Sequence, residues 1–195
     1  MKTLSLKLFT RILFVLFFLT SINIFAHCDG LDGPVVKAAK KALETNNVNL
    51  ALIWVDQKDE NIIKDAFIKT MKVRKLNKDA QQLADYYFFE TLVRIHRQGE
   101  GEPYTGLKPA GRDLGPVIPA ADLSIEKNSF EPIQSVFLKA GKPTEEIQIL
   151  FTKVMNLKNY DPNDVDAGRK YVKAYVAFLH NGEEIYGMVS DDEKN

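Results

Sequence analysis

The sequence resembles itself when it is shifted along its own length by 82 to 84 residues. Seven positions agree at a spacing of 82, and seven more agree at a spacing of 84. The agreeing pairs are Gly33/Gly115, Pro34/Pro116, Val35/Val117, Ala38/Ala120, Ala39/Ala121, Glu44/Glu126, Asn46/Asn128, Ile63/Ile147, Phe67/Phe151, Lys69/Lys153, Met71/Met155, Tyr87/Tyr171, His96/His180 and Glu100/Glu184. A repeat limits the fold strongly, because each copy is expected to form the same unit and to bury its apolar face against the other. The pattern predicts two similar tandem halves.

Apolar residues recur at helical spacing in both halves. Helices are expected at 34–45, 59–74, 79–97, 144–158 and 163–186. The residues expected on the buried faces of the first three include Val35, Ala38, Ala39, Leu43, Ile62, Ile63, Phe67, Met71, Leu83, Tyr87, Phe88, Leu92 and Ile95. One segment, 47–55 (NVNLALIWV), is rich enough in branched residues to predict a strand, and its Trp54 is expected in the core. The sequence therefore predicts an all-α fold, a helical bundle built from two similar tandem halves.

The expected organisation has five parts. Residues 1–26 form a signal peptide, 27–98 the first helical repeat, 99–116 a linker loop, 117–190 the second helical repeat and 191–195 an acidic tail. The linker is too rich in glycine and proline to be helical. It is either a connector or a rigid loop that shapes a pocket, and Tyr104, Lys108 and Arg112 would then be its polar contacts.

The first 26 residues have the pattern of a secretory signal peptide. A basic start precedes an apolar stretch, 12–26, which is shorter than the roughly 20 residues needed to span a bilayer. We expect cleavage after Ala26, and hence a secreted or periplasmic protein without a stable membrane span. Two alternatives are an uncleaved anchor and lipidation of Cys28, which is disfavoured because His27 stands where a small residue is wanted.

Composition excludes some partners. The 26 basic and 26 acidic side chains balance, so the chain has no global positive field and a nucleic acid partner is not expected. The chain has one cysteine, which excludes an internal disulfide. The aromatic run 86–89 must occupy several faces of its helix, which favours burial between neighbours or a homo-oligomer interface.

Cleavage after Ala26 creates a mature chain that begins His27-Cys28-Asp29. The free α-amine, the His27 imidazole, the Cys28 main-chain nitrogen and the Cys28 thiolate then lie within two residues. Their five- and six-membered chelate rings suit nickel(II) or copper(II), ahead of zinc, because nickel and copper favour nitrogen-rich tetragonal sites. Asp29 and Asp32 are expected to supply a carboxylate ligand or to orient one. The sequence thus predicts a transition metal site, and the alternative is a frayed terminus whose His and Cys are incidental.

This start resembles the mature start of the nickel superoxide dismutases, which are helical bundles that begin His-Cys-Asp and wrap a nickel ion with that segment. The resemblance covers residues 27–30 and implies that His27 and Cys28 are metal ligands. Those enzymes have a second cysteine four residues beyond the first, where this chain has Asp32. The second thiolate therefore does not carry over, and the resemblance implies metal binding more than superoxide chemistry.

Three longer segments resemble a family of uncharacterised secreted bacterial proteins. They are HCDGLDGPVVKAA (27–39), VNLALIWV (48–55) and YYFFETLVRIHRQGEGEPYTGLKPAG (86–111). The resemblance supports the boundaries and the fold, and it implies no particular activity.

The two remaining histidines occupy corresponding places in the two halves. His96 and His180 are each followed four residues later by a glutamate, Glu100 and Glu184, so each pair shares one face of a continuous helix. Two such pairs facing each other would be able to hold a metal ion, with the carboxylates as ligands or as orienting groups. The alternative is that each histidine is buried and satisfied by a nearby acid. The N-terminal residues are also able to fold back so that His96 completes their coordination shell.

Three functions follow from these features. The leading hypothesis is an exported helical protein that binds a transition metal through its processed N-terminal His27 and Cys28, with a redox reaction at the metal as one use. A metal-free helical interaction module of the cell envelope is the alternative from another class. A small-molecule pocket between the halves, polar at His96, His180 and Tyr104, is the third.

Overall fold

The computed structural model describes residues 27–188. Its elements are α2 (Pro34–Thr45), α3 (Asn49–Leu52), the 3-10 helix η1 (Gln57–Asp59), α4 (Glu60–Val73), α5 (Lys78–Gly99), α6 (Val117–Lys127), α7 (Glu131–Lys139), α8 (Glu145–Leu157) and α9 (Val165–Met188). No strand occurs within this part of the chain, so the all-α prediction is confirmed. The predicted signal peptide, 1–26, and the predicted acidic tail, 191–195, lie outside the described residues.

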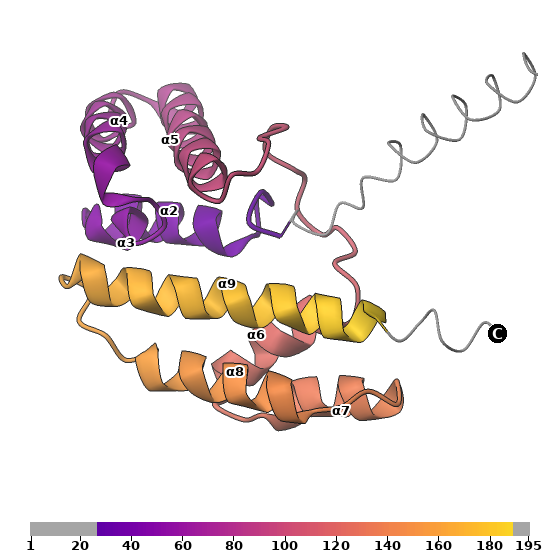
Figure 1. Cartoon of the computed structure of the whole chain (residues 1–195). Helices are drawn as coiled ribbons and strands as arrows, with labels where there is room; N and C mark the ends of the chain where they lie inside the picture. Colours follow the sequence, from indigo (N-terminus) through magenta and orange to yellow (C-terminus); the bar gives the residue numbers. More distant parts are fainter. Residues whose placement is uncertain (1–26, 189–195) are drawn as a thin grey trace, which may run out of the picture.

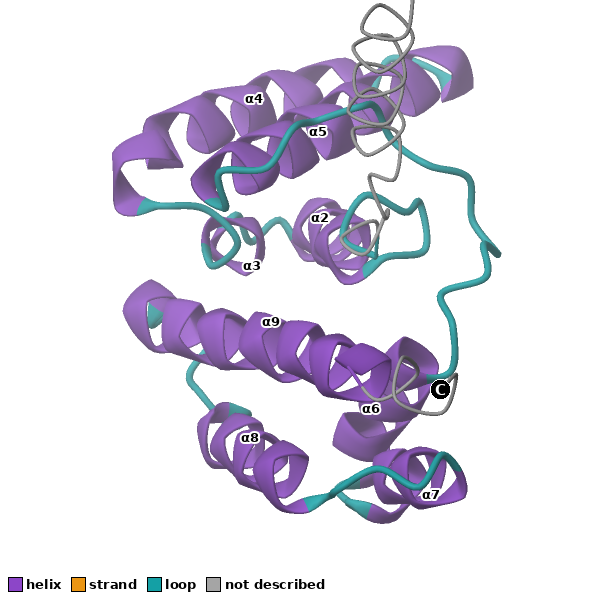
Figure 2. Cartoon of the chain, turned by 45° about the vertical axis from the view of Figure 1, so that its right-hand side comes forward, coloured by secondary structure: helices purple, strands orange, loops and turns teal. Residues whose placement is uncertain are grey.

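The helices form two bodies stacked on each other (Figure 1). Helix α4 packs on α5 in one body, and α8 packs on α9 in the other. Helix α9 lies at the junction, where it also contacts α3 and α6. The loop 100–116 runs down one side of the molecule and joins the two bodies (Figure 2). No helix in the described part of the chain is long and apolar enough to cross a membrane.

Corresponding helices of the two bodies end in the same way. Asn46 ends α2 and Asn128 ends α6, and both residues have φ 53° and ψ 37°. This left-handed conformation is uncommon outside glycine, although asparagine tolerates it at a helix C-terminus. The two asparagines are 82 residues apart, which is the spacing of the predicted repeat. A duplication would produce this correspondence, and the duplication itself stays a prediction.

The predicted strand at 47–55 is wrong. Its residues form the short helix α3 and a following turn, in which Trp54 N–H donates to the Ala51 carbonyl and Val55 N–H to the Leu52 carbonyl. No second strand is available in the described chain, so these local bonds satisfy the backbone. Residues 51–55 are all buried, without the alternation of buried and exposed side chains that a half-buried strand shows. The reason is that the segment is enclosed between helices and does not lie with one face on a sheet. Trp54 lies in the core, as predicted.

Three residues predicted on buried helix faces are instead exposed. Leu83 is 73% exposed and Tyr87 is 47% exposed, and Ile62 on α4 is also exposed. Helix α5 carries apolar residues on more of its circumference than its neighbours cover, so the pattern alone does not identify the buried stripe. Phe88 and Leu92 are fully buried and fix the orientation of α5.

Candidate functional site

Residues 27–33, which we call the hook, form a tight turn before α2. Gly30 N–H donates to the His27 carbonyl, and Gly33 N–H donates to the Gly30 carbonyl. The hook pairs with the long loop, since Lys108 N–H donates to the Asp29 carbonyl at 2.9 Å and Lys108 accepts from Leu31 N–H at 3.0 Å. These main-chain bonds hold the beginning of the described chain in a fixed position.

The His27 side chain reaches across to the second body. It is 10% exposed, and its Nε2 lies 3.3 Å from Oδ2 of Asp122 on α6. The other oxygen of Asp122 accepts a hydrogen bond from the Tyr175 hydroxyl at 2.8 Å. His27 Nδ1 is buried and has no hydrogen-bond partner among the described residues. In a neutral imidazole one nitrogen carries the proton and the other accepts, and a carboxylate beside Nε2 favours the tautomer in which Nδ1 is the acceptor.

The Cys28 thiol is 6% exposed and lies in an acidic environment. Burial raises its pKa, and the negative charges of Glu100 and Asp29 raise it further. Burial also raises the pKa values of Asp29 and Glu100 themselves. The surroundings therefore hold the thiol protonated and favour positive charge.

Arg97 is the cation at the centre of these acids. It is 5% exposed, and it lies 3.5 Å from Asp29, 3.3 Å from Glu100 and 3.6 Å from Glu102. Asp29 belongs to the hook, whereas Glu100 and Glu102 follow the end of α5. Arg97 thus ties the hook to the end of α5.

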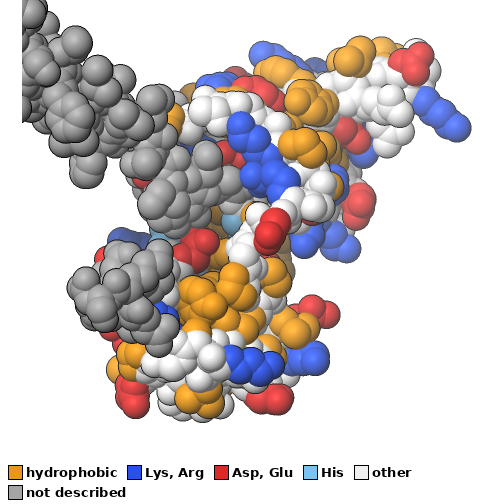
Figure 3. Space-filling model, turned by 90° about the vertical axis from the view of Figure 1, so that its right-hand side faces the viewer, with side chains coloured by type: hydrophobic (Ala, Val, Ile, Leu, Met, Phe, Trp, Pro, Cys, Tyr) orange, Lys and Arg blue, Asp and Glu red, His pale blue; other side chains and the backbone are white. Residues whose placement is uncertain are grey.

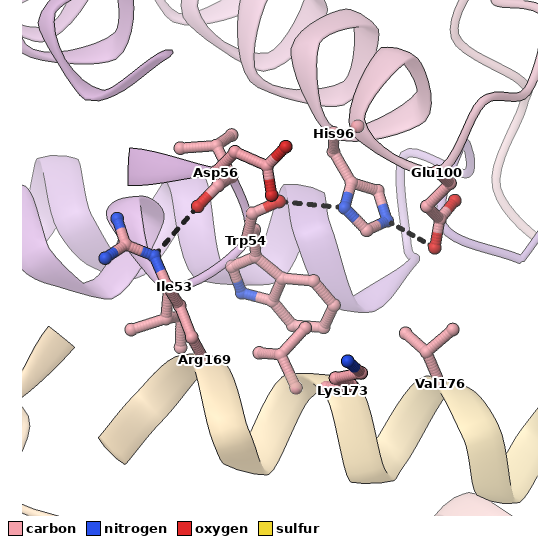
Figure 4. A pocket seen from close by; sticks show the side chains of 11 residues that line it. Ile53, Trp54, Asp56, His96, Glu100, Arg169, Lys173 and Val176 are labelled. Atoms are coloured by element: carbon pink, nitrogen blue, oxygen red, sulfur yellow. Dashed lines mark hydrogen bonds and ion pairs between the residues drawn. The ribbon is translucent and has the colours of Figure 1, made fainter. Parts of the chain in front are cut away.

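His96 is buried, at 4% exposure. Its Nδ1 donates to the Trp54 carbonyl at 2.9 Å, because a carbonyl only accepts. Its Nε2 lies 3.5 Å from Oε1 of Glu100 (Figure 4). Burial lowers the pKa of His96 to about 4, so the ring is neutral near pH 7 and Nε2 carries a lone pair.

A cleft opens beside His96 and Glu100 (Figure 4). Its volume is about 380 Å³, and it lies between the turn after α3, the end of α5 and α9. Helix α9 approaches this turn closely, because a Cβ on Gly168 would overlap the Ile53 side chain. The residues that line it are Ile53, Trp54, Val55, Asp56, His96, Gly99, Glu100, Arg169, Val172, Lys173 and Val176.

The second histidine pair does not mirror the first. His180 is partly buried, and burial lowers its pKa. The charges of Glu100, Arg97 and His96 also affect this pKa. Glu184 is exposed. Its neighbour Glu183 faces inward: Oε2 is buried without a hydrogen-bond partner in the described chain, and burial raises its pKa to about 7.

The remaining predicted residues hold the hook and the loop. Asp32 Oδ2 accepts from Gly111 N–H at 2.7 Å, and this bond lowers the pKa of Asp32. Lys108 and Arg112 lie close enough to Asp29 to lower its pKa. Burial raises the pKa of Tyr104 to about 12, and Tyr104 does not line the cleft. The loop 100–116 therefore holds the hook in place through contacts with Asp29, Leu31 and Asp32.

The structure brings together His27, Cys28, Asp29, His96, Glu100 and His180 from distant parts of the sequence. Figure 3 shows histidine at the junction of the two bodies, beside acidic and apolar side chains. Four more residues surround this group and were not predicted from the sequence: Asp122, Tyr175, Arg97 and Glu183. Within residues 27–188, no group of three or more His, Cys, Asp or Glu side chains is arranged to hold a metal ion.

The sequence model of a family of unknown function (DUF6448) matches residues 32–181. The chain belongs to this family. The resemblance to an uncharacterised domain family is thereby confirmed, whereas its bacterial and secreted character stays a prediction. The DUF6448 match includes the cleft and most of the hook's partners, and it begins after His27 and Cys28. A search of the curated proteins and a search of the solved structures found no significant match.

Buried His96 is expected to make stability depend on pH. Its pKa is about 4 in the folded chain against 6.5 for a free histidine. A lowered pKa gives stability that is present above pH 6.5 and is lost as the pH falls towards 4, by about 3 kcal/mol in all. The measurement is the free energy of unfolding by urea at several pH values. His96→Asn keeps a donor for the Trp54 carbonyl and does not titrate, so its profile should fall less over this range; parallel profiles would contradict the expectation.

Proposed function

We propose that the chain is exported, is cleaved after Ala26, and then binds one nickel(II) or copper(II) ion through its new N-terminus. The donors would be the α-amine, His27 Nδ1, the main-chain nitrogen of Cys28 and the Cys28 thiolate. In this proposal the hook forms the metal site, and cleavage after Ala26 exposes its last donor, the α-amine of His27.

The observation that carries the proposal is the orientation of the His27 ring. Nε2 faces the Asp122 carboxylate, and Nδ1 is buried without a hydrogen-bond partner in the described chain. Nδ1 is the ring nitrogen that closes a six-membered chelate ring with the amine of the same residue. Histidines that bind metal ions commonly donate their other N–H to a carboxylate, which is the place that Asp122 takes here.

The charges around the hook support a bound cation. The carboxyl groups of Asp29, Glu100 and Asp122 are close enough to raise the pKa of the Cys28 thiol. A divalent ion would reverse this effect, because coordination deprotonates a thiol. Two of the four donors are main-chain nitrogens, so the site does not require a cluster of three side chains.

The experiment is a titration of the chain that begins at His27 with nickel(II) and copper(II), followed by calorimetry and visible absorption. We expect one ion per chain, proton release on binding and the absorption of a square-planar site. A matched chain that retains Ala26 has no amine on His27, and its affinity should fall by more than about 100-fold. His27→Ala should have a similar effect.

Two variants on α6 test whether Asp122 contributes to metal binding and Glu126 does not. Asp122→Asn should weaken metal binding by about 10–100-fold, because Asp122 orients His27. Glu126→Gln, one turn away and exposed, should leave it unchanged. Equal affinity with and without Ala26 would overturn the proposal, and so would the absence of any bound ion. The intact mass of the natively exported protein tests the cleavage site separately.

A second candidate function rests on the outer face of α5. Leu83, Tyr86 and Tyr87 are exposed there, and Leu76 just before the helix is 73% exposed. An apolar surface of this kind is typical of a protein interface, which favours the alternative of an interaction module or a homo-oligomer. Sedimentation of the chain with and without metal distinguishes the two functions, because association through α5 does not depend on the hook.

A further inference from the structure

The floor of the cleft presents two hydrogen-bond acceptors side by side. His96 Nε2 carries a lone pair because Nδ1 donates to the Trp54 carbonyl, and Glu100 Oε1 lies 3.5 Å from it. Arg97 occupies the other oxygen of Glu100 at 3.3 Å, so Oε1 is the one left facing His96. His96 is only 4% exposed, and its Nε2 has no hydrogen-bond partner in the described chain. A ligand group with several N–H donors on one nitrogen would satisfy both acceptors.

The walls of the cleft are apolar. Ile53 and Val172 are buried, and Val176, four residues after Val172 on α9, also lines the cleft. The volume of about 380 Å³ falls within the range of small-molecule sites. The cleft therefore suits a compact ligand that has an apolar body.

Two cations line the cleft, and they differ in what holds them. Arg169 donates to the Val55 carbonyl and forms ion pairs with Glu60 and Asp166. Lys173 is exposed on α9, lines the same cleft and makes no ion pair with another described residue. Lys173 is therefore the cation that is available to an anionic group of a ligand.

We propose that this cleft binds a free α-amino acid with an apolar side chain. The ammonium group would donate to Glu100 Oε1 and His96 Nε2, the carboxylate would pair with Lys173, and the side chain would lie against Ile53, Val172 and Val176. This site is separate from the metal donors of the hook, so it does not depend on the proposed function.

The test is calorimetric titration of the chain beginning at His27 with L-leucine, in the presence of a chelator that removes metal ions. We expect saturable binding of one molecule per chain. Two analogues each lack one charged group: 3-methylbutylamine has no carboxylate and 4-methylpentanoic acid has no amine. Each should bind at least about tenfold more weakly, since each loses hydrogen bonds to a charged group.

Two variants test which residues bind the carboxylate and the ammonium group of the ligand. Lys173→Met and Glu100→Gln should each lower leucine affinity at least about tenfold. Lys170→Met, an exposed residue of α9 that does not line the cleft, is the matched control and should bind as the parent does. Lys173 is exposed, so its variant keeps the test informative even where Glu100→Gln fails to fold. No binding of leucine, isoleucine or phenylalanine at about 10 mM overturns the proposal, as does leucine binding that Lys173→Met leaves unchanged.

Discussion

Replacing Arg97 with methionine is expected to lower the free energy of unfolding by about 3–5 kcal/mol near neutral pH. Arg97 is 5% exposed and contacts Asp29, Glu100 and Glu102. Methionine fills part of the same space but leaves the carboxylates of Asp29 and Glu100 buried without their cation, and that uncompensated charge is the source of the loss. Urea denaturation followed by circular dichroism measures it.

The pH dependence of this variant tests the explanation. Burial already raises the pKa values of Asp29 and Glu100, and Arg97 opposes that rise. Without Arg97 both pKa values rise further, so the folded state holds more protons than the unfolded state. The destabilisation should therefore be largest above the raised pKa values and should shrink as the pH falls and the two carboxyl groups become neutral.

Arg94→Met is the matched control on the same helix. Arg94 pairs with Glu90 at 3.2 Å, but its side chain is 42% exposed. An exposed pair four residues apart contributes about 0.3–0.5 kcal/mol, so this variant should lose little. If the two variants lose the same amount, or if the Arg97 variant weakens further on acidification, buried charge is not the explanation.

The helices could be predicted from the sequence because their apolar residues recur every three or four positions. The prediction for α2 reproduces its bounds, 34–45, and Pro34 stands at its start. The segment 47–55 was mistaken because it has no such period: a short run of buried residues reads alike as a strand or as an enclosed turn, and only its neighbours decide. Leu83 and Tyr87 were misplaced because the pattern of α5 does not reveal which of its apolar faces is covered.

Candidate site residues could be proposed only where they stand out in the sequence. His27, Cys28 and His96 were found because histidine and cysteine are rare in this chain, and Glu100 because it lies one helical turn after His96. Asp122 and Tyr175 carry no such signal, since one acid and one tyrosine among many are distinguished only by how α6 and α9 dock on the hook. Helix spacing drew attention to Glu184, which is exposed, and gave no signal for its neighbour Glu183, whose Oε2 is buried.

Replacing Gly33 with alanine is expected to displace the hook. Gly33 has φ −74° and ψ 166°, a conformation that alanine adopts readily, so backbone strain is not the reason. A Cβ there would overlap the His27 carbonyl oxygen and would lie 3.1 Å from the Gly30 carbonyl oxygen. These are main-chain atoms of the hook and cannot rotate away, so the hook itself must move. We expect a loss of about 1–3 kcal/mol in the free energy of unfolding, as for other overpacked sites.

The more direct readout is the reactivity of the Cys28 thiol, because the parent chain buries it to 6% exposure. A thiol reagent should modify Cys28 at least about tenfold faster in Gly33→Ala, since access limits the parent. The same displacement would separate His27 from Asp122, so metal binding by the chain beginning at His27 should weaken in parallel. Gly187→Ala is the control, because a Cβ at Gly187 meets no atom of residues 27–188 within 4 Å. A Gly33→Ala chain whose thiol stays as protected as in the parent would show that the hook absorbs the extra methyl group in place, and the fixed geometry on which metal binding depends would then lose its support.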